Sequence, residues 1–424
     1  MKNVLSQKGL ILQLFNNAVA SIFDYVRAPE LETFWIEREQ ELDPYLGEFL
    51  FPSEQQLGME ITLLKGQTGA PVALRPSAFD AQAIPRNRPG FEQMLVDMIY
   101  FKESKFIYEK DRQQLLQIIS SGNQRQIDII LRRIFDDITE LVRAAALQRE
   151  IMRMTLLTSG TTTVVGNGQN HFVDYGMPEL NKGNAAVDWS DHTNANPIED
   201  IRKAQEIITL ETGIKPTRLI LNSTNLSHLR LNKIINRSIA VFGDGQIIMN
   251  DSNIRSFLQS ELGVTEVIVY DKLYRDDNSG TRANRKFIPD DVVVLVPPGN
   301  LGRTVFGTTP EEADLMNSNV ANVAIVDTGV AITTSEKVDP VNVDTKVSMI
   351  CLPTFDAMHH CYIMTVKGIQ GVSLSIDLDV SPTGYAQGLD MTVAQLKEAL
   401  DAKGVEYVKS ATKAELEALL LGVE

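Results

Sequence analysis

A long amphipathic helix, predicted over residues 124–156, constrains the fold of this chain more than any other feature. Apolar residues recur there at three- and four-residue steps, as on the buried face of a helix: Ile127, Ile130, Leu131, Ile134, Ile138, Leu141, Val142 and Ala145. At about 1.5 Å per residue, the helix is roughly 50 Å long. We therefore expect it to cross a whole domain and to end at the Thr-Ser-Gly sequence of residues 158–160.

The rest of the chain mixes helix and strand patterns, which predicts an α+β protein. Asn196 and Pro197 can begin a helix that Gly213 ends. Strands are predicted over 217–222, 264–271 and 291–298, with a polar loop at 275–285 and a strand-rich region at 319–367.

Residues 58–90 are predicted to form a long protruding hairpin arm. The strand-like segments 59–66 and 70–75 flank the turn sequence Gly-Gln-Thr-Gly. Prolines at 76, 85 and 89 exclude a helix from the stretch that follows and limit random pairing along its edges. Because a two-stranded arm is barely stable alone in water, we expect a partner to cover it.

The composition limits the classes of function. The chain has 424 residues, of which 43% are hydrophobic, so it can bury a sizeable core. Its net charge of −15 argues against broad electrostatic binding of nucleic acid, although an acidic protein can enclose DNA loosely. Two cysteines, Cys351 and Cys361, imply no disulfide framework and a reducing compartment. Neither a signal peptide nor a membrane span is predicted.

Catalytic and metal chemistry are weakly indicated. His359, His360 and Cys361 are candidate metal ligands, but neighbours in a strand point to opposite faces and no fourth ligand is visible. Four aspartates flank a loop and a turn, where Asp commonly forms local hydrogen bonds: Asp276, Asp277, Asp290 and Asp291. The glycine-containing stretch 166–170 lacks the third glycine of a dinucleotide loop. We predict no enzyme, no catalytic, cofactor-binding or metal-binding residues, and no cofactor.

Four segments of the sequence stand out: the hairpin with its arm (59–92), 196–222, 286–312 and 339–355. In the same order, these segments resemble the lambda-type major capsid proteins of tailed phages. The third is the most specific. It has a Phe-Ile-Pro-Asp turn before a strand, a Pro-Gly turn, and then Gly-Arg-Thr-Val-Phe-Gly-Thr-Thr-Pro-Glu-Glu. The resemblance extends over residues 30–367.

This resemblance implies a Hong Kong 97-type capsid fold. Its parts would be an N-terminal arm (1–57), an extended loop (58–90), a peripheral domain (91–189 and 319–368) with spine helix 124–156, an axial domain (190–318), a linker (369–390) and a C-terminal module (391–424). The module resembles helix-extension-helix modules of the LEM and SAP type. Residues 390–424 hold seven acidic and four basic residues, which speaks against phosphate binding. A displayed domain, a protein-contact domain and an inert appendage remain open.

The implied function is that of a major capsid protein, assembled as pentamers and hexamers into an icosahedral head shell around packaged double-stranded DNA. Expected partners are copies of the chain, a separate scaffolding protein, the portal protein and, as a further candidate, a decoration protein. DNA would be enclosed without sequence-specific binding, and no membrane is involved. The expected location is the virion, after assembly in the host bacterial cytoplasm.

The predicted contacts between subunits lie on or beside the arm, since a basic arm on an acidic protein suits self-association. The candidates are Lys65, Arg75, Asp80, Arg86, Arg88 and Phe91. Crosslinking through Lys65 is less favoured than a solvated charge. Three alternatives stay open: a cargo-enclosing shell of the same fold, an intracellular enzyme with an accessory tail domain, and a nucleic-acid-binding protein acting through residues 391–420.

Overall fold

The computed structural model describes residues 28–39, 43–66, 91–107, 109–110, 113, 117, 124–239, 250–276, 283–316, 321–339 and 341–367. All of them belong to one compact unit, residues 1–370, and residues 371–424 form a second unit. The linker and the C-terminal module therefore lie outside the described residues, as do residues 67–90 of the predicted arm.

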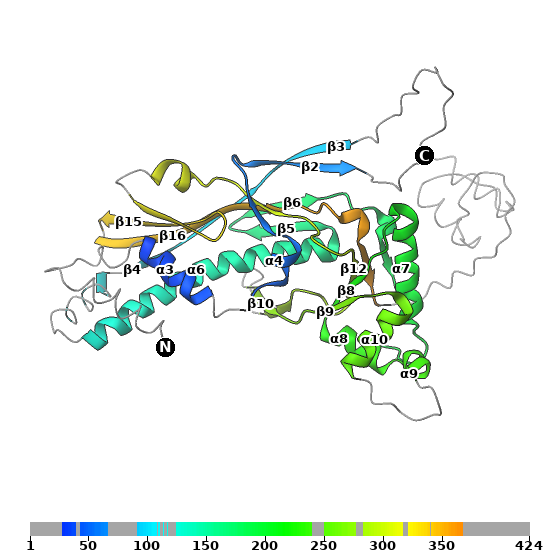
Figure 1. Ribbon diagram of the computed structural model, residues 1–424. Coiled ribbons are helices and arrows are strands. Elements are labelled where there is room, and N and C mark those ends of the chain that lie inside the picture. The colour runs from blue at the N-terminus through cyan, green and yellow to red at the C-terminus, as the bar shows by residue number, and fades with distance from the viewer. Residues whose placement is uncertain are drawn as a thin grey trace, which may run out of the picture. The chain divides into compact units, whose positions relative to one another are not determined.

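Helix α6 (Gln124–Ser159) is the longest element of the first unit (Figure 1). Its 36 residues include the predicted span and three more, and Gly160, with φ of 76°, follows its last residue. Leu141, Val142 and Ala145 are buried, as the periodicity predicts. The helix contacts strands β4, β5 and β16, so it supports most of the sheet structure beside it.

A six-stranded sheet covers α6. Its order is β1-β13-β16-β15-β14, and β4 pairs with β16 on the other side. The strands are β1 (Ser53–Gln55), β4 (Ile99–Ile107), β13 (Thr304–Phe306), β14 (Asn322–Val326), β15 (Val330–Val338) and β16 (Val341–Pro353). The thirteen-residue β16 pairs with three of them, which makes it the centre of the sheet.

A five-stranded sheet has the order β7-β17-β12-β8-β9. Its strands are β7 (Lys182–Asn184), β8 (Arg218–Leu221), β9 (Glu266–Val269), β12 (Val292–Val296) and β17 (Tyr362–Thr365). The side chains of β12 alternate between two hydrophobic cores. Val293 and Leu295 belong to the core that contains residues of helices α7 to α10, which lie between residues 197 and 262, whereas Val294 and Val296 belong to the core that contains residues of α6. Because the centre of the sheet is buried on both faces, strands β12 and β17 read as continuous apolar runs.

Four helices pack with the five-stranded sheet: α7 (Pro197–Thr212), α8 (Ser223–Leu231), α9 (Lys233–Ile239) and α10 (Asp251–Leu262). Asparagine side chains cap three of them by accepting a hydrogen bond from the backbone N–H three residues on: Asn196, Asn222 and Asn250. Gly213 and Gly263 end α7 and α10 in the left-handed conformation, as expected for Gly213.

The remaining elements are short. Three two-stranded ribbons are β2 (Glu60–Gly66) with β3 (Phe91–Asp97), β5 (Thr161–Gly166) with β6 (Gln169–Asp174), and β10 (Leu273–Asp276) with β11 (Ala283–Lys286). The helices are α3 (Ala28–Glu39), α4 (Leu46–Leu50), the 3-10 turns η1 (Glu179–Asn181) and η3 (Met358–His360), and the π-helical turn η2 (Glu311–Leu315).

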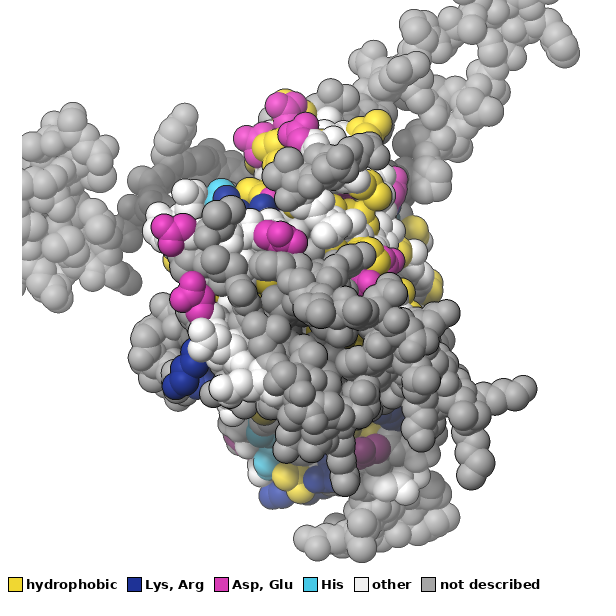
Figure 2. Space-filling view, turned by 90° about the vertical axis from the view of Figure 1, so that its left-hand side faces the viewer, with side chains coloured by type: hydrophobic (Ala, Val, Ile, Leu, Met, Phe, Trp, Pro, Cys, Tyr) yellow, Lys and Arg dark blue, Asp and Glu magenta, His cyan; other side chains and the backbone are white. Residues whose placement is uncertain are grey.

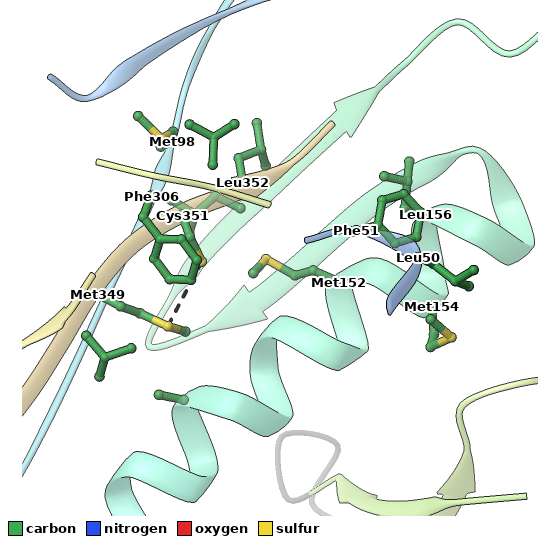
Figure 3. Packing of buried hydrophobic residues seen from close by; sticks show 14 of the residues in the cluster. Leu50, Phe51, Met98, Met152, Met154, Leu156, Phe306, Met349, Cys351 and Leu352 are labelled. Atoms are coloured by element: carbon green, nitrogen blue, oxygen red, sulfur yellow. Dashed lines mark hydrogen bonds between the residues drawn. The ribbon is translucent and has the colours of Figure 1, made fainter. Parts of the chain in front are cut away.

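Sulfur-containing and aromatic side chains fill the core between α6 and the six-stranded sheet (Figure 3). Met152 points from α6 toward Phe306 and Cys351 of the sheet. The Cys351 Sγ atom lies 4.0 Å from Met349 Sδ. Burial raises the pKa of the Cys351 thiol to about 11, so this cysteine is an unreactive core residue.

The predicted 59–66 strand pairs with residues 91–97, a register that places apolar residues of both strands on one buried face, and the predicted strand 70–75 lies outside the described residues. The structure corrects two expectations. The two ends of the predicted polar loop (275–285) are strands, because residues 273–276 pair antiparallel with residues 283–286. His359 and His360 lie in η3, not in a strand.

Each large sheet combines strands from the predicted axial and peripheral spans, and the domain boundaries stay a prediction. β13 lies within the predicted axial span but belongs to the six-stranded sheet. β7 and β17 lie within the predicted peripheral spans but belong to the five-stranded sheet. These pairs join residues that lie between 45 (Phe306 and Cys351) and 181 (Lys182 and Ile363) positions apart in the chain, and local patterns do not encode such pairing.

Candidate assembly surfaces and the contacts that support them

The β2–β3 ribbon is the described base of the predicted arm. Ile61 lies opposite Val96, and Leu63 lies opposite Met94. The first residue of each pair is buried in the core around α6, and the second packs against that core. The ribbon is therefore anchored along one face, so the residues between β2 and β3 leave from a fixed base.

Two of the six predicted contact residues lie in the described backbone. Lys65 is opposite Glu92 and Phe91 is opposite Gly66, at the end of the ribbon farthest from its anchored residues. The side chains of Lys65 and Phe91 are not among those described. Arg75, Asp80, Arg86 and Arg88 lie outside the described residues altogether. The contacts of all six remain a prediction.

Asp327 joins helix α3 to helix α6. Its Oδ2 atom accepts from Arg149 Nη2 at 2.7 Å, and its Oδ1 atom accepts from Trp35 Nε1 at 3.3 Å. The Asp327 residue turns the chain between β14 and β15 with a φ of 49°. The Arg149 guanidinium also lies 5.5 Å from the centroid of the Phe306 ring. One carboxylate thus links α3, α6 and the six-stranded sheet.

Glu150, the next residue of α6, holds the segment that leads to the ribbon. Both of its carboxylate oxygens accept from the Gly47 N–H at 3.1 Å, and Oε1 also accepts from the Tyr270 hydroxyl at 2.7 Å. Arg153 Nη1 lies 4.0 Å from Oε2, and Arg153 Nε donates to Thr304 Oγ1 at 2.7 Å. This buried network connects α4, α6, β13 and Tyr270, the residue directly after β9.

Opposing influences act on the Glu150 carboxyl. Burial raises the pKa of Glu150, while the hydrogen bonds from Tyr270 and Gly47 and the charge of Arg153 lower it. Burial and the Glu150 carboxylate raise the pKa of Tyr270, so this phenol remains a proton donor. Space at the site is tight, because a Cβ atom on Gly47 would lie 2.6 Å from Arg153 Cδ.

Glu311 fixes the loop that carries the Gly-Thr-Thr-Pro-Glu-Glu sequence. Its carboxylate accepts from Tyr100 Oη at 3.0 Å and from Ser348 Oγ at 2.8 Å, and it lies 2.5 Å from Lys346 Nζ. Burial alone would raise the pKa of Glu311, but these partners hold it below its ordinary value. These contacts attach the loop to β4 and β16, and they explain why the motif has a glutamate at position 311.

The residues considered for catalysis have structural partners. Asp290 Oδ1 accepts from Lys286 Nζ at 2.6 Å and from Asn222 Nδ2 at 2.7 Å, and these contacts lower the pKa of Asp290. The Cys361 thiol is buried, which raises its pKa. Within the described residues, no group of three or more His, Cys, Asp or Glu side chains is placed to hold a metal ion.

Sequence reasoning missed the Asp327 and Glu150 contacts. A signal was nevertheless available in the sequence. Arg149, Glu150 and Arg153 are three charged residues in a part of α6 that also contains the buried Met152 and Met154. Charged residues at such positions are normally paired inside the protein. Their partners, however, lie more than a hundred residues away in the chain.

The surface of the described part is acidic with exposed apolar residues. On the face in Figure 2, Asp and Glu side chains lie among hydrophobic ones, and Lys and Arg form only small groups. Across the described helices, none is long and apolar enough to cross a membrane.

Comparison with known proteins identifies similar chains. A family model described as phage major capsid protein E matches residues 34–366. A candidate capsid protein from a prophage of E. coli CFT073 is 15% identical, with a TM-score of 0.50 over 80% of this chain and 99% of its own. No curated protein matches the sequence.

Two further solved structures are similar at lower scores. A phage-related protein from Bordetella bronchiseptica RB50 is 15% identical, with a TM-score of 0.47 over 81% of this chain and 99% of its own. The capsid of Myoviridae phage XM1 is 12% identical, with a TM-score of 0.40 over 75% of this chain and 90% of its own. The likeness to the E. coli protein shows that the fold is shared.

Proposed function

The chain belongs to the phage major capsid protein E family, and from this premise we propose that it assembles as pentamers and hexamers into an icosahedral head around double-stranded DNA. Membership makes it a structural subunit that forms a head shell with copies of itself, and not an enzyme. The observation that carries the proposal is the family match over residues 34–366, which includes α6, both large sheets and the arm.

Within this proposal, the two sheets have different roles. The six-stranded sheet with α6 corresponds to the peripheral domain, and the five-stranded sheet with α7 to α10 corresponds to the axial domain, which meets its copies at the vertices. Pairing of β7 with β17, of β17 with β12, and of β13 with β16, supports adjusted limits for both domains. The acidic net charge of −15 supports loose enclosure of DNA without sequence-specific binding.

The arm between β2 and β3 is proposed to lap over a neighbouring subunit. Residues 67–90 contain three arginines and one aspartate, so they carry a positive charge on a chain whose total is −15. Arg75, Arg86 and Arg88 would face acidic groups of the neighbour, with Lys65, Asp80 and Phe91 beside them. The anchored stem supports this role, because it limits the entropy lost when the arm docks.

Further partners complete the proposal. A separate scaffolding protein would direct shell closure, a portal protein would occupy one vertex, and a decoration protein is a further candidate. Assembly would take place in the host bacterial cytoplasm. Residues 391–424 are proposed as a displayed or protein-contact module, since their acidic excess disfavours phosphate binding.

The arm can be tested by removing it without disturbing its stem. Gly66 and Phe91 are paired residues, so replacing residues 67–90 by Asn-Gly closes β2 and β3 with a two-residue turn. We expect this variant to fold like the natural chain, as judged by circular dichroism and its unfolding midpoint, and to form no shells. Shells of normal size and yield from the shortened chain would contradict the proposed role of the arm.

A further inference from the structure

The part of the described unit that carries α8 and α9 is basic, although the chain as a whole is acidic. Residues 212–243 contain five Lys and Arg residues and no Asp or Glu, in a chain whose net charge is −15. Three of the five cations lie on α8 and α9: Arg230, Lys233 and Arg237. Figure 2 shows Lys, Arg and His side chains together at the lower end of the molecule, where Figure 1 places these two helices.

These three residues form one surface. Lys233 and Arg237 are four residues apart in α9 and therefore lie on the same side of this helix. Helix α9 contacts α8, and Asn236 Nδ2 donates to the Arg230 carbonyl at 3.3 Å, so the residue next to Arg237 touches the last turn of α8. All three basic residues are exposed. We call this surface the α8–α9 cluster, and its residues are Arg230, Lys233 and Arg237.

The α8–α9 cluster is not neutralised by ion pairs. Among the described residues, none of its three side chains forms one. The carboxylate of Asp191, in the loop that contacts α9, accepts from the backbone N–H groups of Thr193 and Asn194 at 3.0 and 3.1 Å and from Asn194 Nδ2 at 2.7 Å. Asp191 therefore stabilises its own turn, and the cluster retains its positive charge.

The stability of the helices does not explain the whole cluster. Arg230 and Arg237 lie in the last turns of α8 and α9, where the helix dipole favours a cation. Lys233, however, is the first residue of α9, where the dipole disfavours a cation. Lys233 and Arg237 also repel each other at their four-residue spacing. The position of Lys233 is therefore unfavourable for the isolated subunit, whereas it is expected if the cluster binds an anion.

The cluster rests on a fixed base. Asn232, between the two helices, accepts through Oδ1 from the Ile235 N–H at 3.1 Å and donates through Nδ2 to the Ala195 carbonyl at 2.8 Å. The Lys233 backbone N–H donates to the His192 carbonyl at 2.8 Å. The Ile235 side chain is fully buried beneath α9. A preformed surface loses little conformational entropy on binding, so the cluster can bind a ligand without rearrangement.

We propose that the α8–α9 cluster binds the phosphate backbone of double-stranded DNA inside the shell. The inference rests on the proposed function, because a shell that encloses DNA presents this partner to its subunits. Protein–DNA interfaces are polar and positively charged, whereas interfaces between proteins have an apolar core. The exposed residues from 230 to 238 fit the first class, since Leu231 is the one apolar residue among them and the others are Arg230, Lys233, Arg237 and Ser238.

The spacing of the cluster suits phosphates along one strand. Lys233 and Arg237 are about 6 Å apart along the axis of α9, and two phosphate steps along one strand of DNA span about 7 Å. Three contacts per subunit give a weak affinity that falls with salt, since each contact contributes about 0.9 to the slope of log K against log salt. The cluster would therefore hold DNA at separate points of the wall, which agrees with loose enclosure by an acidic protein.

Binding of a fluorescently labelled DNA duplex to unassembled subunits tests this site, with anisotropy as the signal. The site variant combines Arg230→Gln, Lys233→Gln and Arg237→Gln. The control variant combines Lys102→Gln, Lys203→Gln and Lys215→Gln, which replace three exposed lysines at scattered positions, so both variants have the same net charge. Circular dichroism checks that each variant is folded.

We expect the natural chain to bind the duplex at low salt, with a slope of log K against log salt of about −2.7 for three contacts. The site variant should bind at least about tenfold more weakly, and the control variant should stay within about threefold of the natural chain.

Equal losses in the two variants, or no affinity of the natural chain at low salt, would overturn the proposal. Poly-glutamate that displaces the duplex as well as unlabelled duplex does would also overturn it and would identify an acidic protein as the partner. Shells from a chain whose subunits do not bind the duplex would refute this inference alone. Duplex binding by a chain that forms no shells would instead be a failure of the proposed function.

Discussion

The Asp327 contact predicts a large stability difference between two Arg–Asp pairs of the same chemistry. The Arg149–Asp327 pair, at 2.7 Å, leaves its side chains 6% and 13% exposed. The Arg303–Asp356 pair, at 3.4 Å, leaves its side chains 49% and 57% exposed. Asp→Asn at either position removes the charge and keeps the size of the side chain. At position 327, it also keeps a residue type that tolerates the φ of 49°.

Asp327→Asn leaves the buried Arg149 guanidinium without its counter-charge, and it replaces one of the two accepting oxygens by an N–H₂ donor, so that Arg149 and Trp35 have a single oxygen between them. Removal of one partner from a buried ion pair costs about 3–5 kcal/mol. Asp356→Asn disrupts an exposed pair, which contributes about 0–1 kcal/mol. The expected gap between the two variants is therefore about 2–5 kcal/mol.

Urea unfolding of the unassembled subunit measures this gap, with far-ultraviolet circular dichroism as the signal. Arg149→Met in the Asp327→Asn background should recover much of the loss, because no buried charge then remains unpaired. If Asp327→Asn lowers the free energy of unfolding no more than Asp356→Asn does, the reasoning about this carboxylate is wrong.

Two further predictions concern the contacts around α6 and η2. Gly47→Ala should destabilise the subunit by about 1–3 kcal/mol, because its Cβ would lie 2.6 Å from Arg153 Cδ. Gly166→Ala, where nothing lies within 4 Å of the added atom, should change stability by less than about 0.5 kcal/mol, and equal urea midpoints for both would refute this. The second prediction concerns pH. The pKa of Glu311 lies below its ordinary 4.5 in the folded state, so the contribution of Glu311 to stability is complete above pH 4.5 and is lost as the pH falls through the folded-state pKa. The stability difference between the natural chain and Glu311→Gln should therefore shrink on acidification below pH 4.5, and a difference that is constant with pH would contradict this.

The local elements could be predicted from the sequence because their signals are local. The three- and four-residue apolar steps predicted α6, and Asn196, Pro197 and Gly213 predicted both ends of α7. The order of the four capsid-like segments predicted the family. Each of these signals lies within a continuous stretch, where periodicity and capping residues decide the structure.

Long-range pairing could not be predicted in the same way. The pairing of β2 with β3 joins strands that are separated by 24 residues of sequence, so no local turn signal predicts it. The register is determined by the burial of Ile61 and Leu63 in the core. The strand that pairs with them cannot be identified from the residues next to β2. Glu150 and Asp327 were missed for a related reason, since a charged residue in an amphipathic pattern is indistinguishable from a solvated one until its partner is known.

The most direct test of assembly is electron microscopy of the natural chain, expressed alone and with its candidate scaffolding protein, after size-exclusion chromatography. We predict closed shells or capsomer-sized rings. Their nucleic-acid content after expression in infected cells would separate a genome-enclosing head from a cargo shell. A clean monomer under both conditions, at every concentration, would contradict the account and leave only the shared fold.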